Sequence, residues 1–141
     1  MISSLVSRAS AALLLLGGVA LLFGADDILP RVIPGFPAGA AWIGQLLAAA
    51  WLPLGALNWL NRSAILGGIY GRPIVMANAA LYFISAMVLG KIVRQPGTPV
   101  AIVGLTVVFG VFAVIYGWLM FRGPLARDVE IHRRAQGSRG V

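Results

Sequence analysis

Four long apolar stretches dominate the chain, and short segments rich in proline, glycine and polar residues separate them. The stretches cover residues 5–25, 38–60, 73–90 and 100–121. A helix of about 20 apolar residues matches the roughly 30 Å hydrocarbon core of a bilayer. The pattern therefore predicts an all-α integral membrane protein whose four transmembrane helices form an up-down-up-down bundle.

The composition supports a membrane protein. Of the 141 residues, 60% are hydrophobic and 11% are charged, against about 45–50% and about 25% in a soluble domain. The chain has no cysteine, which excludes disulfides, thiolate nucleophiles and cysteine-ligated metal or iron–sulfur centres.

The first apolar stretch is either an uncleaved span or a cleaved signal peptide. Cleavage needs small residues upstream of the cut, but Leu22 or Phe23 would occupy the critical position at the end of this stretch. We therefore expect an uncleaved span whose Arg8 side chain reaches the lipid headgroups.

The connection at residues 26–37 contains three prolines and several apolar residues. Because proline interrupts a regular helix, we expect an irregular segment that lies along the membrane interface. Asp26 and Asp27 allow two interpretations: a cation or substrate site at the outer mouth, or a helix cap formed by Asp27.

Small residues at helical spacing predict close helix contacts. Ala40, Gly44 and Ala48 recur every fourth residue, a pattern that lets helix backbones approach in a membrane. The amide of Gln45 should hydrogen-bond to a neighbouring helix, because an unpaired amide is costly in lipid. The predicted helix-packing residues are Ala40, Gly44, Ala48, Gln45, Gly110 and Gly117.

Residues 58–78 form the one stretch in which amides, arginines and glycines interrupt the apolar pattern. Asn58 near the end of the second span and Asn78 in the third should lie at similar depth, so they can meet. Asn78, Tyr82 and Ser85 also share one face of the third helix. This polar seam is either glue between helices or part of a pocket for a lipid, quinone or small molecule.

Arg62 and Arg72 flank the glycine-rich turn of the same stretch. They lie next to the start of the third helix, where the helix dipole favours negative charge. They either bind an anionic headgroup or anchor the helices at the interface. The candidate ligand or lipid-headgroup residues are therefore Arg62, Arg72, Asn58, Asn78 and Tyr82.

The distribution of basic residues predicts the topology. With four spans, the side that carries both termini collects eight arginines, and the other side collects only Arg31, Lys91 and Arg94. The positive-inside rule then places both termini in the cytoplasm. The preference for arginine, alanine and glycine is typical of GC-rich bacterial genes, so we expect a multi-pass protein of the bacterial cytoplasmic (inner) membrane.

The basic tail at residues 122–141 holds five of those arginines. It is expected to anchor the topology at anionic lipid, or to dock a cytoplasmic partner. No motif that reads nucleic acid accompanies the charge, so no nucleic-acid partner is expected.

Little catalytic chemistry is available to this chain. The four predicted spans contain no Asp, Glu, His or Cys, and the single histidine, His132, lies in the tail. We therefore expect no catalytic residues, no metal and no cofactor.

The sequence favours a small non-enzymatic protein with a protein partner or self-association in the membrane, such as an accessory, scaffolding or assembly component of a bacterial membrane complex or a homo-oligomer. The alternative is a lipid-, quinone- or small-molecule-binding carrier or membrane enzyme with its site at the cytoplasmic ends of the second and third helices.

Overall fold

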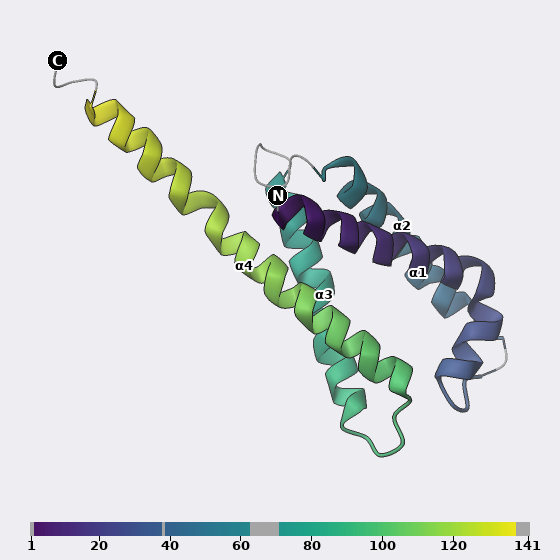
Figure 1. The fold of residues 1–141 in the computed structure, drawn as a ribbon. Coiled ribbons are helices and arrows are strands. Elements are labelled where there is room, and N and C mark those ends of the chain that lie inside the picture. Colours follow the sequence, from purple (N-terminus) through teal and green to yellow (C-terminus); the bar gives the residue numbers. More distant parts are fainter. Residues whose placement is uncertain (1, 38, 63–70, 138–141) are drawn as a thin grey trace.

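The computed structural model describes residues 2–37, 39–62 and 71–137 (Figure 1). These residues form four helices and no strand: α1 (Ile2–Val32), α2 (Trp42–Leu60), α3 (Gly71–Val93) and α4 (Val100–Gly137). Each helix contains a stretch that is long and apolar enough to cross a membrane. The prediction of an all-helical protein with four such helices is confirmed, and it fits a multi-pass membrane protein.

The helices are arranged as two hairpins. α1 packs along α2, and α3 packs along α4, whereas contacts between the two pairs are far sparser. Figure 1 shows the hairpins running in different directions, so they meet over a limited region. The few side chains in that region must therefore hold the two hairpins together.

Two helices run further than the sequence predicts. α1 continues to Val32 through Pro30, after a kink at Gly24, where φ is −121° and ψ is 15°. Pro30 has no N–H to donate and its ring crowds the carbonyl four residues earlier, and α1 ends two residues after it. α4 continues as a helix to Gly137, across most of the segment expected to be a separate tail.

Glycines let α1 and α2 approach closely. A Cβ atom added at Gly44 would lie 2.8 Å from Leu29 Cδ1, and one added at Gly55 would lie 3.1 Å from the Leu15 backbone nitrogen. Ala48, one turn after Gly44, is fully buried. Gly44 and Ala48 thus lie at the helix contact expected from their spacing, whereas Ala40 precedes the first residue of α2 and is half-buried.

The α3–α4 hairpin packs differently, through aromatic rings. Tyr82 of α3 stacks on Phe112 and Tyr116 of α4, with ring centroids 4.8 and 5.7 Å away. A Cβ atom added at Gly110 or Gly117 would meet nothing within 4 Å. The predicted close contact at these two glycines is therefore not made among the described residues, because the rings, and not the glycines, occupy the interface.

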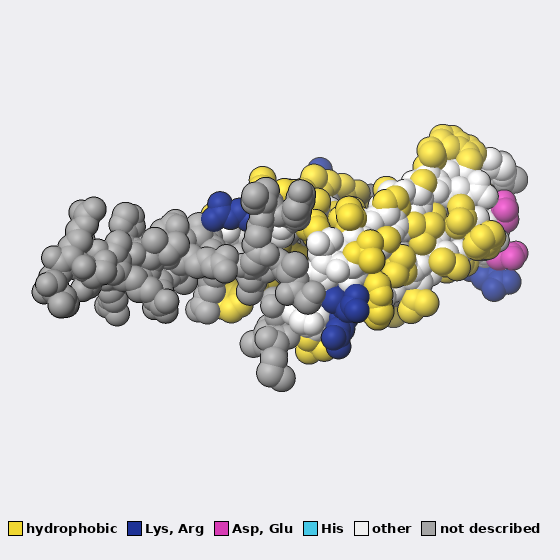
Figure 2. Space-filling view, turned by 90° about the horizontal axis from the view of Figure 1, so that it is seen from above, with side chains coloured by type: hydrophobic (Ala, Val, Ile, Leu, Met, Phe, Trp, Pro, Cys, Tyr) yellow, Lys and Arg dark blue, Asp and Glu magenta, His cyan; other side chains and the backbone are white. Residues whose placement is uncertain are grey.

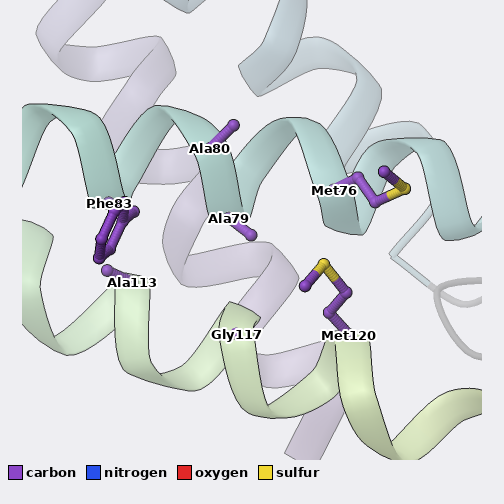
Figure 3. A pocket seen from close by; sticks show the side chains of 7 residues that line it. All are labelled: Met76, Ala79, Ala80, Phe83, Ala113, Gly117 and Met120. Carbon is purple, nitrogen blue, oxygen red and sulfur yellow. The ribbon is translucent and has the colours of Figure 1, made fainter.

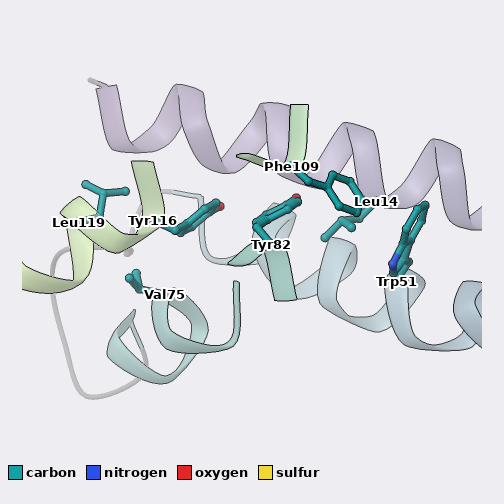
Figure 4. Packing of buried hydrophobic residues seen from close by; sticks show 7 residues of the cluster. All are labelled: Leu14, Trp51, Val75, Tyr82, Phe109, Tyr116 and Leu119. Atoms are coloured by element: carbon teal, nitrogen blue, oxygen red, sulfur yellow. The ribbon is translucent and has the colours of Figure 1, made fainter. Parts of the chain in front are cut away.

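The hydrophobic core joins the two hairpins (Figure 4). Its fully or nearly fully buried members come from all four helices and are Leu14, Trp51, Val75, Tyr82, Phe109, Tyr116 and Leu119. Phe109 makes edge contacts with Trp51 at 5.7 Å and with Tyr82 at 5.4 Å. These contacts connect α2 and α3 through a ring on α4.

Much of the outer surface is apolar, as a lipid-facing surface requires. Large exposed hydrophobic side chains occur on every helix, among them Leu16, Leu46, Phe83 and Val114. Many hydrophobic side chains are visible on the face of the protein drawn in Figure 2.

We predict that Gly55→Ala destabilises the protein whereas Gly104→Ala does not. The Gly55 methyl would press on the α1 backbone, which costs about 1–3 kcal/mol when packing cannot adjust. A methyl at Gly104 meets nothing within 4 Å, and alanine favours the helix by up to about 1 kcal/mol. Reversible unfolding of both variants in detergent micelles measures the difference, and equal stabilities would contradict the close α1–α2 contact.

Candidate functional site

Five polar side chains are buried together where the two hairpins meet. Ser7 and Ser10 belong to α1, Asn58 to α2, and Asn78 and Tyr82 to α3, and all five are 0% exposed. We call these residues the polar cluster. Each lies on the inner face of its helix, so the cluster connects three helices at one point.

A reciprocal pair of amides forms the centre of the cluster. Asn58 Nδ2 donates to Asn78 Oδ1 at 2.8 Å, and Asn78 Nδ2 donates to Asn58 Oδ1 at 2.7 Å. This is the contact that the depth of the two residues in the sequence predicts. Both side-chain carbonyls have a donor, and each amide group has used one of its two hydrogens.

The second hydrogen of each amide is also used. Asn58 Nδ2 donates to Ser10 Oγ at 2.9 Å, and Asn78 Nδ2 donates to the Ile74 carbonyl of its own helix at 2.8 Å. Neither amide therefore has an unused hydrogen with which to bind a ligand.

The serines fasten α1 to this pair. Ser7 Oγ donates to the backbone carbonyl of Asn58 at 2.7 Å. Ser10 Oγ lies 2.6 Å from the Tyr82 hydroxyl and 3.4 Å from Asn78 Oδ1. Because unpaired polar groups are costly in a lipid interior, this mutual satisfaction stabilises the meeting of α1, α2 and α3.

Arg62 and Arg72 lie outside the cluster. The Arg62 guanidinium donates to the Trp59 carbonyl at 2.7 Å and sits 4.8 Å from the centre of the Trp59 ring. It thus covers the end of its own helix. Arg72 is exposed at the start of α3, and the glycine-rich turn at residues 63–70 lies outside the described residues. Of the five candidate ligand residues, the structure brings together Asn58, Asn78 and Tyr82 only.

Gln45 does not occupy the predicted position between helices. It is exposed, whereas its neighbour Gly44 faces α1. Adjacent helical residues point about 100° apart, so only one of the two can face the partner helix. Gln45 lies in the first turn of α2, near enough to the helix end for its amide to reach polar surroundings.

A shallow groove lies between α3 and α4 (Figure 3). Its volume is about 350 Å³, and its apolar lining consists of Met76, Ala79, Ala80, Phe83, Ala113, Gly117 and Met120. The lining holds no charged or hydrogen-bonding side chain, so any binding there would depend on shape and apolar contact. Elsewhere among the described residues, no three His, Cys, Asp or Glu side chains gather as a metal site would require.

Ser7 and Ser10 were not predicted as members of a polar site. These serines are three residues apart, and with Ala11 and Leu14 they form one buried face of α1. Two serines three residues apart in an otherwise apolar stretch indicate a polar contact on one face of the helix. It was easy to miss because single serines are common at the ends of transmembrane helices and carry no charge.

Comparisons of the chain with protein-family models, with curated proteins and with solved structures gave no match.

We predict that Asn78→Leu lowers the stability by about 1–3 kcal/mol, because Asn58 Oδ1 then loses its donor while it stays buried. Asn61→Leu is the matched control: the Asn61 side-chain amide donates to the Leu57 carbonyl of its own helix in an exposed position, so its effect should stay within about 0.5 kcal/mol. Reversible unfolding measures both.

The double variant Asn58→Leu/Asn78→Leu distinguishes a purely structural role of the amide pair from a role in a ligand pocket. Removing both partners leaves neither amide unpaired, so it should cost less than the sum of the two single changes. Strictly additive losses would show that the pair is not coupled. An intact fold that loses a bound molecule would favour the pocket.

Proposed function

We propose that this is a small non-enzymatic integral membrane protein that works through helix association. It would serve as an accessory, scaffolding or assembly component of a bacterial membrane complex, or as a homo-oligomer. The observation that supports this proposal is the saturation of the amide pair. Asn58 and Asn78, the buried amides of the described residues, bond within and between α1, α2 and α3. These bonds use all four of their amide hydrogens and leave none for a substrate or cofactor.

The open face of the α3–α4 hairpin also supports association. Gly110 and Gly117, which lie on one side of α4 because seven residues make about two turns, have room for a side chain that the described residues do not fill. In the α1–α2 hairpin, by contrast, Gly44 and Gly55 are in close contact with a neighbouring helix. Glycine weakens a helix unless a close contact uses the space, and a helix of a partner or of a second copy would supply that contact.

The groove on the same face favours a second candidate function. Its volume of about 350 Å³ lies within the range of small-molecule pockets, and its lining suits an acyl chain or the tail of a quinone. Under this reading the protein is a lipid-, quinone- or small-molecule-binding carrier or enzyme, with Arg62 and Arg72 near the headgroup.

Native mass spectrometry after gentle extraction tests these functions. A fixed heteromeric partner or a defined oligomer supports the first, and a retained lipid or quinone on a single chain supports the second. A bare monomer would contradict both.

Gly117→Leu should weaken the assembly at least severalfold, because the new side chain fills the open face, whereas Ala49→Leu on the exposed side of α2 should leave it intact.

We further propose that both termini and the α2–α3 connection are cytoplasmic in a bacterial inner membrane. The arginine distribution supports this topology. Because the chain has no native cysteine, single cysteines can be introduced directly.

We predict that Pro34→Cys and Gln95→Cys react with a membrane-impermeant maleimide in intact spheroplasts, whereas Arg72→Cys reacts only after lysis. All three positions are exposed, so burial does not confound the result. The reverse labelling pattern would invert the proposed topology.

A further inference from the structure

Arg72 lies on the same face of α3 as the apolar groove, one helical turn before it. It precedes the groove residues Met76, Ala79 and Phe83 by four, seven and eleven positions, a spacing that places all four residues on one face of a helix. Arg72 is exposed. The face of α3 that lines the groove therefore continues, toward the start of the helix, into a positive charge.

The groove is open to the outside of the protein along its length. Figure 3 shows Met76 and Met120 at one end and Phe83 beside Ala113 at the other. Met76 and Phe83 are each 58% exposed, so a lipid can enter the groove sideways from the bilayer. The flexible methionines lie at the end nearer Arg72 in the sequence of α3, and their side chains can adjust to an occupant.

The length of this face matches one leaflet of a membrane. Eleven residues separate Arg72 from Phe83, which is about 16 Å along a helix. Half of the hydrocarbon core of a bilayer is about 15 Å thick. With Arg72 at the level of the headgroups, the groove therefore runs beside the acyl chains of a single leaflet and ends near the middle of the bilayer.

Charge and lining together select the occupant. The lining has no hydrogen-bonding side chain, which suits an acyl chain and offers no donor to the ring of a quinone. Arg72 is complementary to an anionic headgroup, and a guanidinium suits a phosphate because it can donate two parallel hydrogen bonds. The first turn of a helix also favours negative charge. Arg62 is not part of this site, because it lies at the end of α2 and donates to the Trp59 carbonyl.

We propose that an anionic phospholipid binds with one acyl chain in the α3–α4 groove and its headgroup at Arg72. This inference rests on the second candidate function proposed above and names the class of its ligand. The bound chain fills space that α3 and α4 leave open between them, and the headgroup neutralises the exposed charge.

Native mass spectrometry of the full chain in a neutral detergent tests this proposal. The probes are phosphatidylglycerol, which is anionic, and phosphatidylcholine with the same acyl chains, which has no net charge. We expect one phosphatidylglycerol to bind about fivefold more tightly, as a single arginine beside an anionic lipid provides. Equal affinities would overturn the proposal, and this comparison needs no variant.

Two pairs of variants locate the lipid. Arg72→Gln should abolish the preference for phosphatidylglycerol, whereas Arg94→Gln, which is also exposed but follows the other end of α3, should retain it. Ala80→Phe fills the groove and should weaken the binding of both lipids at least severalfold, whereas Ala77→Phe, exposed outside the lining, should not. A preference that survives Arg72→Gln, or binding that Ala80→Phe leaves unchanged, would overturn the proposal.

Failure of this proposal is distinguishable from failure of the second candidate function. A retained quinone or neutral lipid that Ala80→Phe displaces and Arg72→Gln does not would overturn the anionic ligand and leave that function standing. Absence of any bound lipid or quinone on the unaltered protein would overturn both.

Discussion

The reciprocal hydrogen bonds between Asn58 and Asn78 are the interaction on which the arrangement of this protein depends. Lipid offers no hydrophobic drive for helices to associate, and the two hairpins share few contacts. An amide that leaves its partner in an apolar interior loses hydrogen bonds that no water replaces. The pair therefore fixes both the register of α2 against α3 and the place where the hairpins meet. Tyr82, which bonds to Ser10, connects this point to the rings of Phe109 and Trp51.

The two hairpins solve the problem of membrane packing in opposite ways. In α1–α2, small residues bring the backbones together, so dispersion contacts between the helices themselves dominate. In α3–α4, stacked aromatic side chains line the contact, and Gly110 and Gly117 are left with open space beside them. The first hairpin is thus complete within the chain, whereas the second offers unfilled space, and this asymmetry supports placing any partner against α3 and α4.

Apolar patterning was enough to predict four helices, because length and hydrophobicity decide whether a helix suits a membrane. Depth along the spans was enough to pair Asn58 with Asn78. The rotation of each helix about its axis was harder to predict from the sequence. Gln45 follows Gly44 directly, yet Gly44 faces α1 and Gln45 is exposed. Gly110 and Gly117 have open space beside them because no side chain of α3 fills it. The spacing of glycines within α4 alone does not reveal which α3 side chains lie opposite. Ser7 and Ser10 were missed because their importance comes from partners 48 to 72 residues away in the chain.

The amide pair also sets an order of events during synthesis. The α1–α2 hairpin emerges from the ribosome first, and Ser10 can already accept from Asn58 Nδ2 at that stage. The Asn58 side-chain carbonyl has no donor until Asn78 arrives on the next helix. The nascent hairpin therefore carries several unsatisfied polar groups: Asn58 Oδ1, one hydrogen of Asn58 Nδ2, and the Ser10 hydroxyl hydrogen, whose partners all lie on α3. These groups find their partners only when α3 is in place, so the first hairpin reaches its final hydrogen bonding only after the third helix has been made.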